Sequence, residues 1–201
     1  LALTVSLLTA CGGGGGGGAA AVAGMQVATF IDAPVSGVEF EGPNYSGTTD
    51  DNGNLYYHAG DRVTLKLGSL ILGSVSPNGD KITPLDLISG ASSSSDARVV
   101  RILRTLQSLD SDGDPETNGI SITAESRRSL RASTDLDLSS ESTHDNDVHL
   151  RIPGGFTRTE TEAKSHFENH RNDASHATRG YGSKTVVTQA TNTTGRLLAS
   201  N

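Results

Sequence analysis

The sequence of 201 residues contains no tryptophan, a single cysteine, four phenylalanines and four tyrosines. Because Cys11 is the only cysteine, an internal disulfide is excluded. Hydrophobic residues make up 34% of the chain, which is lean for a globular protein. Most of the aromatic residues fall between Phe30 and Tyr57, so the best core material lies early in the chain and the later part is poorly supplied.

Basic residues are also scarce, since 16 Lys and Arg face 23 Asp and Glu and leave a net charge of -7. A nucleic-acid partner is therefore not expected, because binding a polyanion needs a basic face.

The apolar run of residues 1–10 is too short to span a bilayer as a helix, which takes roughly 20 residues, but it has the length of a signal-peptide core. No methionine or basic segment precedes it, so we interpret it as a signal peptide clipped at its amino end.

The segment Leu7-Leu8-Thr9-Ala10-Cys11 resembles the lipobox of bacterial lipoproteins. The resemblance implies cleavage before Cys11, acylation of its sulfur and, with Gly12 following, sorting to the outer membrane. The alternative is a structural, buried cysteine after a cleaved apolar segment. Residues 11–28, rich in glycine and alanine, then form a tether between the lipid anchor and the folded part. The expected localisation is the outer membrane of a Gram-negative cell envelope, held by a lipid anchor.

From residue 29 onward, short apolar runs alternate with turn signals, which predicts strands near 35–40, 55–58, 63–67 and 70–75. In the third of these runs, Val63, Leu65 and Leu67 alternate with polar residues, the period of a half-buried strand. Strands joined by short glycine turns predict an antiparallel, β-sandwich-like sheet over residues 30–76.

An amphipathic helix is predicted over residues 96–109, packed on this sheet, which makes the fold class α+β. Its apolar positions at helical spacing are Val99, Ile102, Leu103, Leu106 and Leu109. A second, shorter helix is predicted over residues 82–90.

Residues 29–125 would form the β module with the amphipathic helix and an acidic loop. Residues 126–172 would be loop-rich and weakly ordered, with a helix near 158–171 opened by a capping box at Thr157, and 173–201 a tail or the truncated start of another module.

The stretches "VSGVEF" and "GTTDDNGNLYYHAGDRVTLKLG" resemble carboxypeptidase-regulatory-like and collagen-adhesin B-type β modules. Over a longer span, the chain resembles the amino-terminal region of poorly characterised Gram-negative surface lipoproteins. The segments that carry this resemblance are, in order, Asp32–Val38, Thr49–Gly53, Ile82–Leu87 and Leu109–Ile120. The resemblance implies an architecture, and it implies little about activity.

The acidic loop that follows the predicted helix is a candidate calcium site, because alternating carboxylates in a loop can converge on a cation that prefers six to eight oxygen ligands. The candidate ligands are Asp110, Asp112, Asp114, Glu116 through its backbone carbonyl, and Asn118. A complete EF-hand is excluded, since Pro115 and Ser121 stand where glycine and the bidentate glutamate belong. The alternative is that these residues only end the helix at Leu109 and turn the chain.

Two further clusters are weaker candidates. The segment "THDNDVH" is interpreted as a solvated loop. His166 and His170 lie four residues apart and could bind zinc, with Glu162 one turn earlier and His176 downstream. Because the order does not match His-Glu-x-x-His, a metalloprotease is disfavoured, and we interpret these histidines as exposed helix residues.

No nucleophile elbow, phosphate loop or other catalytic pattern occurs, so no catalytic residue is assigned and no enzymatic activity is expected. The sequence predicts a non-catalytic outer-membrane lipoprotein that presents an adhesin-like binding module to a surface or extracellular ligand, with a calcium-stabilised loop. The alternative is the amino-terminal accessory domain of a longer exported enzyme. An outright zinc hydrolase using His166 and His170 is the least favoured hypothesis.

Overall fold

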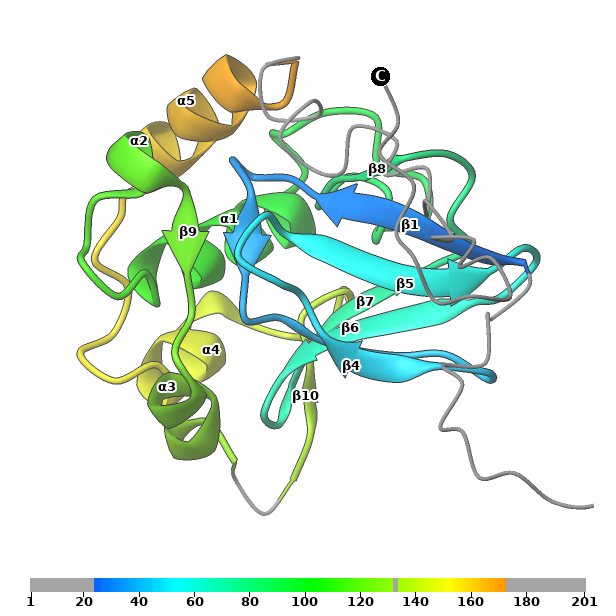
Figure 1. Ribbon diagram of the computed structural model, residues 1–201. Coiled ribbons are helices and arrows are strands. Elements are labelled where there is room, and N and C mark those ends of the chain that lie inside the picture. Colours follow the sequence, from blue (N-terminus) through cyan, green and yellow to red (C-terminus); the bar gives the residue numbers. More distant parts are fainter. Residues whose placement is uncertain (1–23, 132–133, 173–201) are drawn as a thin grey trace, which may run out of the picture.

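The computed structural model describes residues 24–131 and 134–172, in which strands and short helices form an α+β fold (Figure 1). The strands are β1 (Met25–Phe30), β2 (Val35–Ser36), β3 (Glu39–Glu41), β4 (Ser46–Thr48), β5 (Asn54–His58), β6 (Val63–Leu67), β7 (Leu70–Val75), β8 (Lys81–Ile82), β9 (Ile120–Ser121) and β10 (Leu136–Asp137). The helices are α1 (Ala97–Ser108), α2 (Pro115–Asn118), α3 (Ala124–Ser129), α4 (Asp145–Arg151) and α5 (Glu160–His170).

The strands form a five-stranded sheet in the order β10-β7-β6-β3-β4, a three-stranded sheet in the order β5-β1-β8, and the pair β2-β9. The prediction of an antiparallel sheet is correct for the strands of the expected module, such as β3, β6 and β7. It is wrong for the sheets as a whole, because β8, β9 and β10 pair in parallel with β1, β2 and β7. These three are two-residue strands that reach the sheets through long connections, which parallel pairing requires.

The alternation predicted for β6 is confirmed, since Val63, Leu65 and Leu67 are buried while the residues between them are partly exposed. Gly53 closes the turn before β5 with a φ of 76°, and a Cβ there would lie 2.9 Å from the carbonyl oxygen of Phe30. This close approach explains the need for glycine in that turn. Strand β1 begins at Met25, inside the segment expected to be tether, because it pairs along its length with β5.

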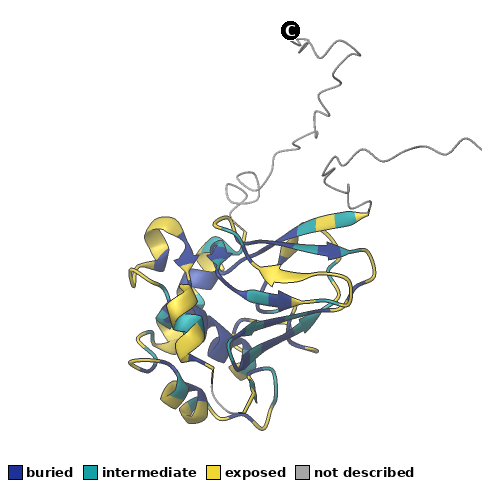
Figure 2. Ribbon diagram, turned by 60° about the horizontal axis from the view of Figure 1, so that its bottom comes forward, coloured by how far each residue is buried: buried dark blue, intermediate teal, exposed yellow. Residues whose placement is uncertain are grey.

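Helix α1 is confirmed close to its predicted bounds. Asp96 caps its first turn by accepting a hydrogen bond from the backbone amide of Arg98, and the amide of Leu109 closes the last turn. The apolar stripe of α1 is buried in the core formed with the strands (Figure 2). Its buried guanidinium, Arg101, binds Asp145 at 2.9 Å and the carbonyl oxygen of Leu138, which holds α4 against α1.

The part expected to be loop-rich and weakly ordered contains more structure than predicted. The segment "THDNDVH", interpreted as a solvated loop, contributes most of α4, because Val148 packs into the core and Arg101 pairs with Asp145. Helix α5 is confirmed, but its capping box is formed by Thr159 and Glu162, not by Thr157. The prediction of a helix over residues 82–90 is wrong. Ile82 ends β8, and successive turns follow it, in which the Asp86 carboxylate accepts hydrogen bonds from Thr83.

Helices long and apolar enough to cross a membrane are absent from the described ranges. The predicted signal peptide, the predicted lipidation site Cys11, residues 173–201 and His176 lie outside the described residues.

Candidate metal centre

Helix α5 presents one face to the core, and this face carries both of its histidines. Ala163, His166, Phe167 and His170 follow one another at helical spacing, and the first three are buried. The side chain of His166 is 1% exposed and that of His170 is 17% exposed. The interpretation of these residues as exposed is therefore wrong: His166 is buried in the stripe that docks the helix, and His170 is only partly exposed.

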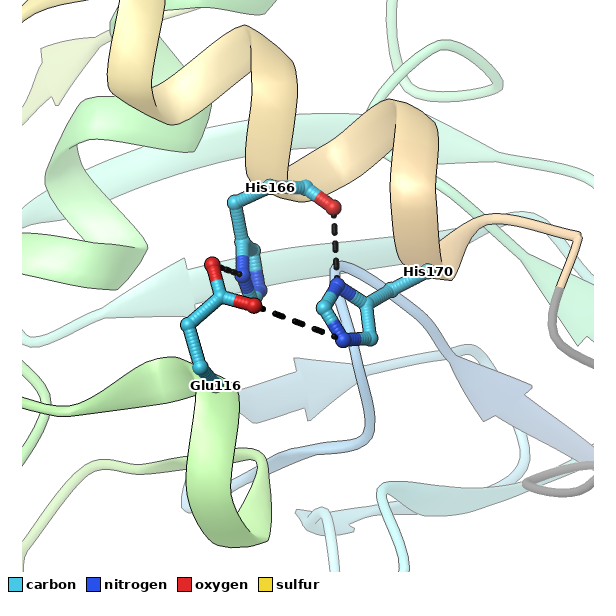
Figure 3. A group of neighbouring side chains, drawn as sticks. All are labelled: Glu116, His166 and His170. Carbon is cyan, nitrogen blue, oxygen red and sulfur yellow. Dashed lines mark hydrogen bonds and ion pairs between the residues drawn. The ribbon is translucent and has the colours of Figure 1, made fainter.

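The acidic loop supplies the partner of these histidines. Asp114 caps α2 by accepting a hydrogen bond from the backbone amide of Glu116 at 3.3 Å. The Glu116 side chain leaves this short helix toward α5 (Figure 3). Its Oε1 lies 2.8 Å from Nδ1 of His166, and its Oε2 lies 3.7 Å from Nε2 of His170. The carboxylate comes from 50 residues earlier in the chain than His166, and it is Glu116, not Glu162, that joins the pair.

Two backbone carbonyl groups fix the orientation of the rings. Nε2 of His166 lies 3.0 Å from the carbonyl oxygen of Asp32, and Nδ1 of His170 lies 2.8 Å from the carbonyl oxygen of His166. A carbonyl oxygen can only accept, so both of these ring nitrogens carry hydrogen. In neutral rings, the nitrogens that face the Glu116 carboxylate are then the unprotonated ones. An unprotonated imidazole nitrogen is the atom through which a histidine binds a metal ion.

The spacing of the three residues suits a small cation. One ligand atom from each of Glu116, His166 and His170 lies within 4.8 Å of the other two. A tetrahedral zinc ion with bonds of about 2.0 to 2.1 Å separates its ligand atoms by roughly 3.3 Å. The Oε1 contact with His166 at 2.8 Å and the Oε2 contact with His170 at 3.7 Å are both close to this separation, so each histidine lies within reach of an ion bound to the carboxylate.

A buried polar group lies behind His166. The carboxyl of Asp32 is fully buried, and Nε2 of Gln107 donates to it at 3.0 Å and to the carbonyl oxygen of Ala163. Burial raises the pKa of Asp32 to about 8, and the Glu116 charge also contributes. Oε1 of Gln107 is buried without a hydrogen-bond partner. A proton on Asp32 would supply a donor of the kind that this oxygen lacks.

The aspartates of the predicted calcium loop are engaged within the loop. Oδ1 of Asp110 accepts from the amide of Ser121 at 2.8 Å, and Asp112 accepts from the amide of Asp114 and from the side chain of Asn118. Burial raises the pKa of Asp110, while the Asp114 amide lowers that of Asp112. These contacts agree with the alternative in which the run ends a helix and turns the chain. Calcium binding stays a prediction, and the Glu116 carboxylate is directed to the histidines.

Comparison with protein-family models, with curated proteins and with solved structures finds no match to this chain.

Proposed function

We propose that this domain binds one divalent transition-metal ion of the zinc type through the Glu116 carboxylate, Nδ1 of His166 and Nε2 of His170. The observation that carries the proposal is the pair of backbone carbonyl contacts, which leave the unprotonated nitrogen of each neutral ring facing one carboxylate. Histidines that bind metals commonly donate their other ring N–H to a carbonyl in this way. Two nitrogen donors favour zinc over calcium, which prefers oxygen ligands.

The charges at the site also favour an ion. With a hydrogen already on Nε2 of His166, the 2.8 Å contact between its Nδ1 and Glu116 is attractive only when a second proton or a cation lies between them. A metal ion satisfies this contact and the His170 contact together, whereas one proton satisfies only the first. The proposed ion would link α2 to α5 and so stabilise the docking of α5.

Zinc titration of the EDTA-treated protein, followed by calorimetry and thermal unfolding, tests the proposal. At a free zinc concentration of 100 times the dissociation constant, binding adds about 2.7 kcal/mol to the free energy of unfolding. For a domain of this size, the melting temperature then rises by about 5 to 10 °C. Calcium at the same concentration is expected to leave this transition unchanged in the variant Asp112→Ala, which removes the predicted calcium ligand.

Glu116→Gln and His170→Ala are the informative variants, because both side chains are partly exposed and their loss spares the core. We expect each to weaken zinc binding by more than about 100-fold, beyond the 10- to 100-fold typical of outer hydrogen-bond partners. Matched controls are Glu125→Gln and His144→Ala, which change exposed residues outside the cluster. Equal zinc affinity in all five proteins, or none in the wild type, would refute the proposal.

For the setting of this centre, we propose an exported lipoprotein that is acylated at Cys11 and presents a non-catalytic, adhesin-like module at the outer membrane. The resemblance of Leu7 to Cys11 to a lipobox and the glycine-rich segment that follows support the anchor. We also propose that the sheets pack in a β-sandwich-like arrangement and that the chain is related to Gram-negative surface lipoproteins. The alternative is an accessory domain of a longer exported enzyme, favoured if the reading frame continues into a hydrolase pattern.

A further inference from the structure

Within residues 24–131 and 134–172, the centre has fewer protein donors than a closed zinc site. Structural zinc sites have four protein ligands, whereas sites with three keep a position for water or another ligand. In the part of the chain that the structure describes, the cluster of histidine, cysteine and acidic residues contains only Glu116, His166 and His170. We propose, resting on the proposed function, that the bound ion keeps one coordination position open for a carboxylate or similar monoanion from outside the domain.

The buried carboxyl of Asp32 does not fill this position. It lies 3.9 Å from Nε2 of His166, on the side of the imidazole ring opposite to the coordinating Nδ1. The ring of His166 therefore separates the Asp32 carboxyl from the proposed ion.

The open position faces solvent. The exposure of the three side chains increases from His166 at 1% through the half-buried His170 at 17% to the exposed Glu116 at 52%. The buried His166 would close the inner side of the ion, and the more accessible Glu116 and His170 would lie toward its outer side. Figure 3 shows Glu116 approaching from α2 and both histidines approaching from α5.

Charge selects the kind of ligand. Two neutral imidazoles and one carboxylate leave a divalent ion with a net charge of about +1. A monoanion neutralises the centre, whereas a cation would be repelled. A carboxylate combines this charge with the oxygen donor that zinc accepts at about 2.0 to 2.2 Å. The source is either a small carboxylic acid or an acidic side chain of a second copy of this chain.

Cobalt(II) replaces zinc in such sites and reports its coordination by visible absorption. The EDTA-treated protein is loaded with cobalt and titrated with acetate and with azide, with the His144→Ala variant as the matched control. We expect a saturable change of the cobalt spectrum that is the same in wild type and control, and absent in His170→Ala at the same cobalt concentration. Acetate should also lower the apparent cobalt dissociation constant severalfold, as linkage requires.

The outcomes separate the two proposals. Without a protein-bound cobalt spectrum, the metal-binding proposal itself fails. A cobalt spectrum that neither anion alters refutes the open position while leaving the metal centre intact. A spectrum that changes on dilution without added anion, with a dimer in sedimentation at the higher concentration, assigns the carboxylate to a second copy. A spectrum that changes with acetate and is independent of protein concentration assigns it to a small acid.

Discussion

Replacing Asp32 by asparagine is expected to stabilise the metal-free protein, although it removes a buried carboxyl. The folded-state pKa of about 8 stands well above the ordinary value of 3.8 because the group is fully buried. Between these two values, the folded protein holds a proton that the unfolded chain has released. Stability is therefore lost as the pH rises through this window, at about 1.4 kcal/mol per pH unit.

Between pH 5 and pH 8 this group alone removes about 4 kcal/mol from the free energy of unfolding. Asparagine has a similar shape and no such proton equilibrium, and its side-chain oxygen can still accept the hydrogen bond from Nε2 of Gln107. Urea unfolding in EDTA at both pH values, for wild type and Asp32→Asn, measures the effect. The advantage of the variant should grow by about 4 kcal/mol from pH 5 to pH 8.

The difference between the two proteins cancels titrations elsewhere in the chain. If the variant gains no advantage between pH 5 and pH 8, Asp32 is held ionised and the desolvation argument is wrong. Glu116→Gln provides a second measure. Removal of the Glu116 charge should lower the pKa of Asp32 and so reduce the stability that the protein loses between pH 5 and pH 8.

Three further predictions concern the α2 cap, the acidic loop and the lipobox-like segment. Asp114→Ala removes the cap of α2 and should weaken zinc binding about fivefold, the equivalent of about 1 kcal/mol, in the calorimetric titration, since Glu116 begins in that turn. Asp112→Ala should abolish calcium binding if the predicted loop site forms, and calorimetry showing equal, negligible heat for both proteins would exclude the ion. Cys11→Ser should abolish palmitate labelling in cells, and retained labelling would exclude acylation at that sulfur.

Periodicity predicted the elements whose side chains meet the core in a regular pattern. β6 and α1 were predicted within a residue or two, because strict alternation and a continuous apolar stripe leave one reading each. The two-residue strands β8, β9 and β10 could not be predicted from the sequence, since two residues are too few to show a periodic pattern. Their pairing depends on long-range backbone contacts, such as the amide of Leu136 donating to the carbonyl oxygen of Ser69.

Half of the candidate site could be predicted from the sequence. Ala163 and Phe167 mark the inner face of α5, and His166 lies between them in the same stripe, so the pattern itself indicates an inward histidine. His170 continues that face one turn later. Glu116 could not be assigned, because nothing local connects a side chain in α2 to a helix 50 residues further on. The burial of Asp32 is equally a product of the tertiary structure.

The acidic run and the histidine pair therefore contribute to the same candidate site. Three aspartates in the run accept hydrogen bonds from donors of the same loop, and this fixes the turn from α1 into α2. Glu116 differs, since its carboxylate reaches out of the loop to α5. A loop held rigid by its own hydrogen bonds reduces the conformational entropy that the glutamate loses on binding a metal ion. By this argument the aspartates contribute to metal affinity by positioning Glu116, without touching the ion.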